Sequence, residues 1–119
     1  MTTFEPVNVA QSVVAAHFHL TVADMTSANR ERRISHPRQM AMAICREISS
    51  LSLSQIGKRF GGRDHSTVLH ALDAVERRKV ASSYRMTFDD LRLQAEAIIR
   101  PVFIRQSEKP VFRSVRGKA

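Results

Sequence analysis

An all-α, compact domain is the fold class that the sequence predicts, and three observations support it. Apolar residues recur every three or four positions in several stretches, which is the period of an amphipathic helix. Before the final tail, no useful stretch alternates with the period of two that half-buried strands show. Apolar residues make up 43% of the 119 residues, which is enough for one core in a chain too short for two full-sized domains.

Two helical segments are expected before the first basic region. Residues 8–19 form an amphipathic stretch with Asn8 as a candidate cap, since asparagine can accept from the free N–H groups at a helix start. A short helical turn follows over residues 22–25, and residues 27–35 are polar and basic, which is typical of a loop. The apolar side of the first helix is expected to consist of Val9, Val13 and Ala16.

A third helix is predicted to begin at His36-Pro37. Proline at the first helical position lacks only a backbone donor that would have no partner there. Cys45 is the only cysteine, so an internal disulfide and a four-cysteine zinc site are excluded, and we interpret it as a small core residue. The apolar stripe of this helix is expected to consist of Met40, Ile44, Cys45 and Ile48.

Two short helices joined by a glycine-containing turn follow, an arrangement typical of a helix-turn-helix. Ser52 and Gln55 have the spacing of a capping box, which opens a helix that ends at Gly61-Gly62. Asp64 can cap the next helix, which is expected to run to about Lys79. The residues expected to face inward are Leu53, Ile56, Phe60, Val68, Leu69, Leu72 and Val75.

The last helix is predicted to begin at another capping box, formed by Thr87 and Asp90, and to end at Pro101. Residues 101–119 are expected to be a flexible basic tail that could order on a protein partner. The predicted organisation is therefore an N-terminal extension over residues 1–7, one helical domain over residues 8–100, and the tail.

Positive charge is unevenly distributed along the chain, whose formal net charge is +8. Residues 27–63 carry eight cations against two acids, and the last twenty residues carry six cations against one acid. Of the 19 cations, 15 are arginine and four are lysine. The planar guanidinium suits phosphate and guanine, so this pattern favours a polyanionic partner over charge that only keeps the surface soluble.

The helix-turn-helix supplies candidate base-reading residues. The first turn of its second helix faces the major groove in such motifs. Here that turn carries small or hydrogen-bonding side chains that can contact base edges: Asp64, His65, Ser66 and Thr67. The alternative is that Asp64 and Ser66 are ordinary residues of a helix start.

Arginines near this motif supply candidate backbone and minor-groove contacts. Arg30, Arg32 and Arg33 lie in the expected loop, from which an arginine can extend into a minor groove. Arg38 and Arg46 are eight residues apart, so we expect both near one helix face, opposite the apolar stripe. Such a face, with Gln39 beside Arg38, could contact phosphates.

Residues 37–70, PRQMAMAICREISSLSLSQIGKRFGGRDHSTVLH, closely resemble the C-terminal DNA-binding domain of the bacterial replication initiator, DnaA. The run GGRDHSTVLHA is the most specific part of a resemblance that extends over residues 8–100. The resemblance implies a six-helix, Trp-repressor-like domain that binds a short asymmetric DNA site, the initiator box. It also implies that Arg30 enters the minor groove and that the major-groove contacts come from Asp64, His65, Ser66 and Thr67. Contacts to the DNA backbone would be made by Arg32, Arg38, Gln39, Arg46, Leu53 and Ser54.

The sequence departs from the family pattern at several positions. Asn29 and Glu31 flank Arg30 where the family's loop is more uniformly basic, and Glu31 could pair with Arg38. Ser66 stands where threonine is common, and Ser54 stands where proline is common. The family's ATPase module is expected to be missing, because the phosphate-binding motif G-x-x-x-x-G-K-[ST] occurs nowhere in the 119 residues.

These observations predict a non-catalytic, sequence-specific binder of double-stranded DNA that regulates transcription or replication initiation. We expect it to be cytoplasmic and associated with the nucleoid, since the sequence shows no secretory signal and no run of the roughly 18 apolar residues needed to span a membrane. No cofactor or metal site is expected, because His17 and His19 would point away from each other on a helix. Two alternatives stay open: a non-specific nucleic-acid binder, and an adaptor that binds another protein, with the tail as one route.

Overall fold

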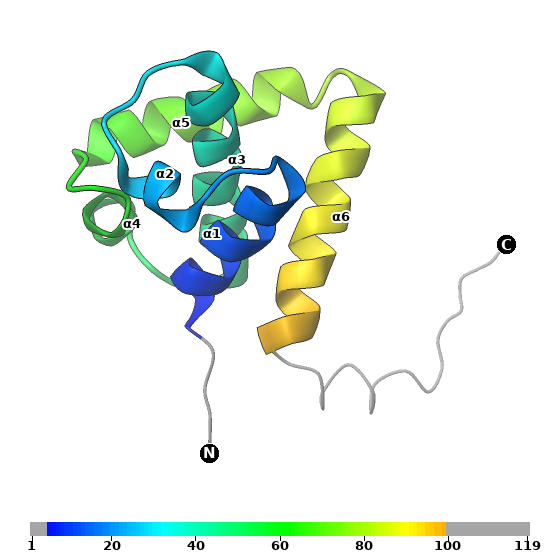
Figure 1. Ribbon diagram of the computed structural model, residues 1–119, viewed down its shortest axis with the longest axis horizontal. Helices are drawn as coiled ribbons and strands as arrows, with labels where there is room; N and C mark the ends of the chain where they lie inside the picture. The colour runs from blue at the N-terminus through cyan, green and yellow to red at the C-terminus, as the bar shows by residue number, and fades with distance from the viewer. Residues whose placement is uncertain (1–4, 100–119) are drawn as a thin grey trace, which may run out of the picture.

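The computed structural model describes residues 5–99, which form six helices and no strand. The all-α prediction is therefore confirmed. α3 contacts each of the other five helices, and Figure 1 shows α1, α5 and α6 arranged around it. The helices are α1 (Pro6–His17), α2 (Val22–Thr26), α3 (Arg32–Ile48), α4 (Leu53–Arg59), α5 (His65–Arg78) and α6 (Ser82–Ile99).

The middle of α3 forms the centre of the core. Residues 40–45, with the sequence MAMAIC, are all buried, so this stretch of the helix is apolar on every side. A helix that is apolar all round is stable only where other elements cover it completely. The predicted stripe of Met40, Ile44, Cys45 and Ile48 is confirmed as buried.

Two helices begin earlier than the sequence predicts. α1 begins at Pro6, and its N-cap is Glu5 rather than Asn8, because the additional turn buries Val7 completely. α3 begins at Arg32, so the second half of the predicted loop is helical. The earlier start places Ile34 in the core at 3% exposure, and Pro37 then lies inside the helix, where it lacks one backbone hydrogen bond.

α6 also begins earlier, at Ser82, so the capping box predicted at Thr87 and Asp90 does not form. Both residues lie inside the helix, where Asp90 accepts a hydrogen bond from Gln94 at 3.0 Å. The extra turns carry the half-buried Tyr84, one helical turn before the fully buried Phe88. Burial of these aromatic side chains favours the longer helix.

The helix-turn-helix prediction is confirmed in its local details. Ser52 accepts from the Gln55 amide at 3.1 Å, and the Gln55 side chain accepts from the Ser52 amide at 2.8 Å. Asp64 accepts from the Ser66 amide at 3.1 Å at the start of α5. Two residues expected in the core are instead exposed, Ala16 on α1 and Leu69 on α5.

Candidate nucleic-acid interface

The first turn of α5 presents the predicted base-reading residues to solvent. All four side chains are accessible to a ligand, because the structure exposes Asp64, His65, Ser66 and Thr67. Hydrogen bonds from the Ser66 hydroxyl and the Ser66 amide lower the pKa of the Asp64 carboxyl. Asp64 therefore caps α5 as a carboxylate, and His65 Nδ1 lies 3.7 Å from its Oδ1.

The loop over residues 27–31 is ordered by its own polar groups. The Asn29 amide donates to Ser27 Oγ at 3.3 Å, and the Glu31 amide donates to Asn29 Oδ1 at 2.8 Å. Glu31 pairs with Arg33 at 3.5 Å, so the suggested pairing of Glu31 with Arg38 is wrong. Arg30 is exposed and makes no hydrogen bond or ion pair with any residue that the structure describes.

Arg38 does not lie on an exposed face of α3. It is only 4% exposed because α2 and the loop cover this side of the helix. Its guanidinium donates to the Asp24 carbonyl at 3.2 Å, to Ser27 Oγ at 3.2 Å and to the Asn29 carbonyl at 2.8 Å. The expected shared exposed face of Arg38 and Arg46 is therefore wrong, and Arg38 fastens the loop to α3.

A hollow of about 510 Å³ lies where the loop, α3, the α4–α5 turn and α5 meet. The loop contributes Arg30, α3 contributes Arg38 and Gln39, and α5 contributes Thr67. The fold thus brings the loop arginine and Thr67, in the first turn of α5, to one concave surface.

Gln39 is oriented by a residue from the far end of α5. Arg78 Nη1 donates to Gln39 Oε1 at 2.7 Å. This contact uses the acceptor atom of the Gln39 amide, which leaves the Nε2 group as the donor next to the hollow.

Three other predicted contact residues form a separate group outside this hollow. Arg46 is exposed near the end of α3, and its Nη1 donates to the Leu51 carbonyl at 2.8 Å, just before α4. Leu53 is half-buried and Ser54 is exposed in the first turn of α4. Arg32 is exposed at the first position of α3 and is also outside the hollow.

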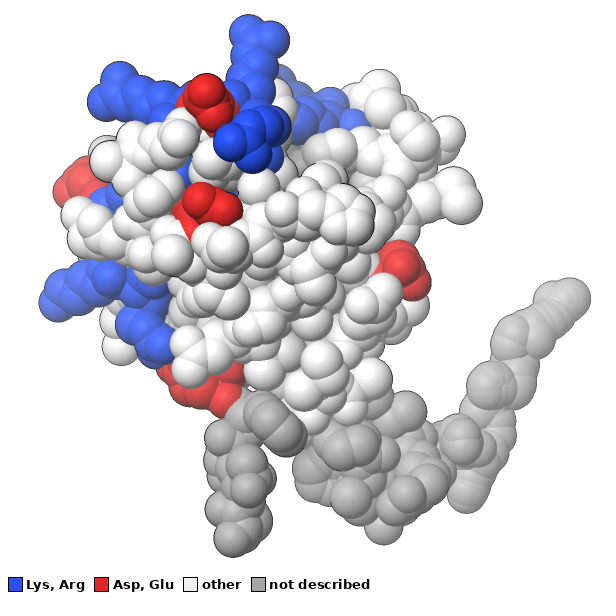
Figure 2. All heavy atoms as spheres, in the orientation of Figure 1, with Lys and Arg blue, Asp and Glu red and all other residues white. Residues whose placement is uncertain are grey.

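Lys and Arg side chains gather along the upper and left edges of the face in Figure 2, over the start of α3 and over α4. The part of this face over α1 and α6 is mostly uncharged. A polyanion would therefore be drawn toward the edge that carries the loop and the helix-turn-helix.

Arg63, in the turn between α4 and α5, is a residue that the sequence prediction missed. Its Nη2 donates to the Ser27 carbonyl at 2.6 Å, and its Nη1 donates to the Phe60 carbonyl. Ser27 is 36 residues away in the chain, so no local spacing could have revealed this contact.

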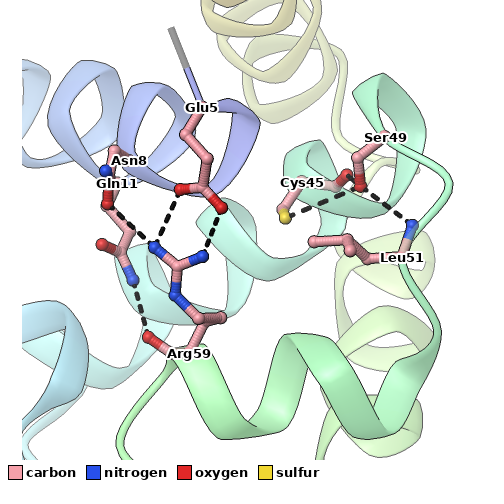
Figure 3. A network of polar contacts seen from close by, with 7 residues as sticks. All are labelled: Glu5, Asn8, Gln11, Cys45, Ser49, Leu51 and Arg59. Atoms are coloured by element: carbon pink, nitrogen blue, oxygen red, sulfur yellow. Dashed lines mark hydrogen bonds and ion pairs between the residues drawn. The ribbon is translucent and has the colours of Figure 1, made fainter.

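A second polar network joins α1 to the end of α4, as Figure 3 shows. Arg59 forms a two-pronged ion pair with Glu5, with Nη2 donating to Oε1 at 2.8 Å, and Nη2 also donates to Asn8 Oδ1 at 3.2 Å. Gln11 Nε2 donates to the Arg59 carbonyl at 3.0 Å, which satisfies an acceptor at the end of α4. Arg59 and Gln11 thus fix α4 against α1.

The same view shows the surroundings of Cys45. The Ser49 hydroxyl donates to the Cys45 carbonyl at 2.7 Å and accepts from the Leu51 amide at 3.3 Å. Burial raises the pKa of the Cys45 thiol to about 11. The prediction of a structural core cysteine is therefore confirmed.

Across residues 5–99, no three His, Cys, Asp or Glu side chains come together in a way that could hold a metal ion. Over the same residues, none of the helices has the length and apolar character that crossing a membrane demands.

Comparisons with known proteins place these features in a family. The model of the family described as "Bacterial dnaA protein helix-turn-helix" matches residues 7–75. The chromosomal replication initiator protein DnaA of Zymomonas mobilis is 49% identical over 70 residues, which are 59% of this chain and 14% of that protein. The protein of the same name from Francisella tularensis subsp. novicida is 46% identical over 90 residues, 76% of this chain and 18% of that protein.

A solved structure agrees with the sequence comparisons. The crystal structure of a DNA replication initiation factor superposes with a TM-score of 0.69 at 32% identity. The match covers 79% of this chain and 30% of the other chain. The chain spans less than a fifth of the length of the two DnaA relatives named above.

Proposed function

Because the chain belongs to the bacterial DnaA helix-turn-helix family, we propose that it binds double-stranded DNA and recognises the sequence of an initiator-box-like site. One observation carries this proposal. Arg30 and Thr67, an exposed residue of the first turn of α5, line the same hollow, so a single duplex could meet both the loop and the start of α5. A reader of the major groove and a reader of the minor groove on the same surface give sequence recognition from two directions.

The proposed base contacts divide between the two grooves. Arg30 enters the minor groove, where narrow A·T tracts concentrate negative potential. The first turn of α5 enters the major groove, where His65, Ser66 and Thr67 can donate to or accept from base edges. The Asp64 carboxylate can accept from the cytosine amino group while it caps the helix.

The proposed backbone contacts comprise Gln39, which lines the hollow, and four residues outside it. Gln39 Nε2 donates to a phosphate, because Arg78 already occupies the Gln39 oxygen. The other proposed backbone contacts are Arg32, Arg46, Leu53 and Ser54, all exposed except the half-buried Leu53. For Arg38 we propose a positioning role in place of the phosphate contact, since its guanidinium already donates to Ser27 and Asn29 of the loop.

We further propose that the chain regulates transcription or replication initiation by occupying its sites on the nucleoid. The 119 residues contain no G-x-x-x-x-G-K-[ST] motif that could bind a nucleoside triphosphate. Occupancy, with local positioning of partners, is therefore the mechanism that we assign to these residues. A protein partner at the tail, residues 101–119, is a prediction that lies outside the described residues.

The first experiment measures DNA binding and its sequence preference. The preferred site is selected from a random duplex pool, and its affinity is compared with that of a scrambled duplex by fluorescence anisotropy at two salt concentrations. We expect a preference on the order of 10³-fold, with both affinities falling as salt rises. Equal affinities for the two duplexes would instead support the non-specific binder, and no binding to either would support the protein adaptor.

Two variants test the groove assignments. The probe for Arg30→Ala is a site in which 2,6-diaminopurine replaces adenine, because the added amino group changes only the minor-groove edge. When 2,6-diaminopurine replaces the adenine that Arg30 contacts, wild type should lose about tenfold in affinity. The same replacement should change the affinity of Arg30→Ala only slightly. His65→Ala should lose discrimination among major-groove substitutions. The matched control is Arg85→Ala, an exposed arginine on α6, and it should bind like wild type.

A further inference from the structure

We propose that Arg63 is a positioning residue for specificity: it fixes the loop that carries Arg30 against the start of α5, so that both grooves of one duplex are read together. The inference rests on the proposed function, and it assigns a role to a side chain that itself contacts no base. Arg63 belongs to the turn of the helix-turn-helix, and one of its main partners belongs to the loop.

The guanidinium of Arg63 bridges two segments that are far apart in the chain. One nitrogen donates to the Ser27 carbonyl at 2.6 Å, and the other donates to the Phe60 carbonyl at the end of α4. The side chain is half-buried, so water competes less for these bonds than at a free surface. The bridge therefore relates the position of the loop directly to the position of the helix-turn-helix.

The backbone beneath this bridge leaves no space for adjustment. A Cβ built on Gly61 would lie under 3.0 Å from the carbonyl oxygen of Thr26, the last residue of α2, so the turn lies directly against the backbone that leads into the loop. The Arg63 amide donates to the Gly57 carbonyl at 2.8 Å, and a Cβ on Gly57 would collide with the Arg63 carbonyl. The backbone that carries Arg63 is thus held against α4 as firmly as its side chain is held against the loop.

Arg38, on α3, also holds the same loop. It donates to the Asn29 carbonyl at 2.8 Å, next to Arg30 in the chain, and to the Asp24 carbonyl at 3.2 Å. Two arginines from different elements therefore satisfy backbone carbonyls at both ends of the segment before Arg30. With its backbone fixed in this way, Arg30 reaches out from a defined point although its own side chain is free.

This geometry matters because recognition sites tolerate displacements of only about half an ångström before contacts weaken. A loop released from the turn would keep its positive charge and would still attract phosphates. It would lose the fixed offset between Arg30 and the first turn of α5. The expected defect is therefore a loss of minor-groove discrimination, with the general affinity for DNA largely retained.

The test uses Arg63→Lys, which keeps the charge but replaces the planar fork with a single ammonium that cannot reproduce both bonds in the same geometry. Its matched control is Arg59→Lys, which breaks a fork in the same helix-turn-helix on the side facing α1. Each protein binds the selected site with and without 2,6-diaminopurine at each adenine, and with substitutions that alter the major-groove edge.

We expect Arg63→Lys to reduce the diaminopurine penalty at the Arg30 position from about tenfold to about twofold and to retain major-groove discrimination. Arg59→Lys should retain both. The double variant Arg30→Ala/Arg63→Lys should show no further loss at that position beyond Arg30→Ala alone. This non-additivity distinguishes positioning from a general structural role, which would weaken every base preference together.

Several results would overturn the inference. An unchanged diaminopurine penalty in Arg63→Lys, an equal loss at major-groove positions, or additive losses in the double variant would each do so while wild type still discriminates. Loss of discrimination in wild type itself would overturn the proposed function, and the inference with it. If Arg63→Lys proves too unstable to assay, Arg38→Lys releases the loop from α3, and retention of the full penalty there would count against the inference.

Discussion

Arg59 and Arg63 are four residues apart, yet they fasten the helix-turn-helix to two regions of very different chemistry. Arg59 faces α1 and pairs with the carboxylate of Glu5, whose side chain is 40% exposed. Arg63 faces the loop and bonds to the backbone carbonyls of Ser27 and Phe60. One contact is an ion pair near solvent, and the other is a charged donor on neutral acceptors.

The difference has consequences for pH and salt. A carboxylate can be protonated, and an exposed ion pair is screened by salt. A backbone carbonyl is not protonated in this pH range, and as a neutral acceptor it does not form an ion pair that salt can screen. The packing of α1 on α4 should therefore weaken in acid or high salt, whereas the geometry of the loop beside α5 should not. The surface that we propose for DNA recognition is therefore held by the contacts of Arg63, which we expect to depend little on pH or salt.

The largest expected effect comes from Gly61, where the turn of the helix-turn-helix lies closest to the end of α2. Gly61→Ala places a Cβ against the Thr26 carbonyl at a residue with φ +88°, whereas Gly62, with φ +75°, has no atom within 4 Å of a new Cβ. We expect Gly61→Ala to lower the free energy of unfolding by about 3 kcal/mol or more, and Gly62→Ala by about 1 kcal/mol. Urea unfolding of the two variants measures the difference. Similar losses for both would mean that the turn is not in tight contact with the end of α2.

An intermediate effect separates arginines that contact DNA from arginines that position the loop. Arg46→Ala should weaken binding to every duplex by a similar factor, by about 1 kcal/mol, and should reduce the salt dependence by about one phosphate contact. Arg46→Lys retains the charge and should retain most of the affinity. Affinities measured over a series of salt concentrations check this prediction. A loss confined to the preferred site would assign Arg46 to sequence reading instead.

The smallest effect tests the pair that faces α1. The hydrogen bond from Arg59 holds the pKa of Glu5 below its usual value near 4.5. A lowered folded-state pKa stabilises the fold above the unfolded pKa, and this contribution is lost as pH falls through the folded pKa. Because the pair is exposed and screened, we expect about 0.5 kcal/mol at neutral pH.

Glu5→Gln removes this contribution at neutral pH and should make little difference well below pH 4. Unfolding free energies at pH 7 and in acid, each at low and high salt, measure the change. The control is Asp89→Asn, an exposed acid on α6. A Glu5→Gln effect that is equal at both pH values would contradict the role of the carboxylate charge. DNA preference should be unchanged in Glu5→Gln at neutral pH.

Much of the fold could be predicted from local patterns. The capping residues Ser52 and Asp64 and the pair Gly61-Gly62 define the helix-turn-helix within a few residues, and the structure confirms them. The predicted starts of α3 and α6 are late because Pro37 and the Thr87–Asp90 spacing are typical of helix starts, whereas both helices begin earlier. Ile34 and Tyr84 lie at helical spacing from core residues and indicate the earlier starts of α3 and α6.

The interface was harder to predict than the fold. The exposure of Arg30, His65 and Thr67 agrees with the sequence prediction, since each lies at a loop or a helix start whose local signals are strong. Arg38 was misplaced because helical periodicity cannot show that α2 and the loop cover that side of α3. Arg63 was missed because its partner at Ser27 is brought to it only by the tertiary fold.

The buried Cys45 has a practical consequence for experiments on this chain. With a pKa of about 11 and no exposed surface, its thiol stays protonated and sheltered from maleimide reagents near neutral pH. Since no other cysteine occurs in the chain, Ala28→Cys would introduce the single reactive thiol, at an exposed position in the loop. Ala28 lines the hollow, so a fluorophore attached there would sense the approach of DNA to that surface, and no native residue of the core would be removed.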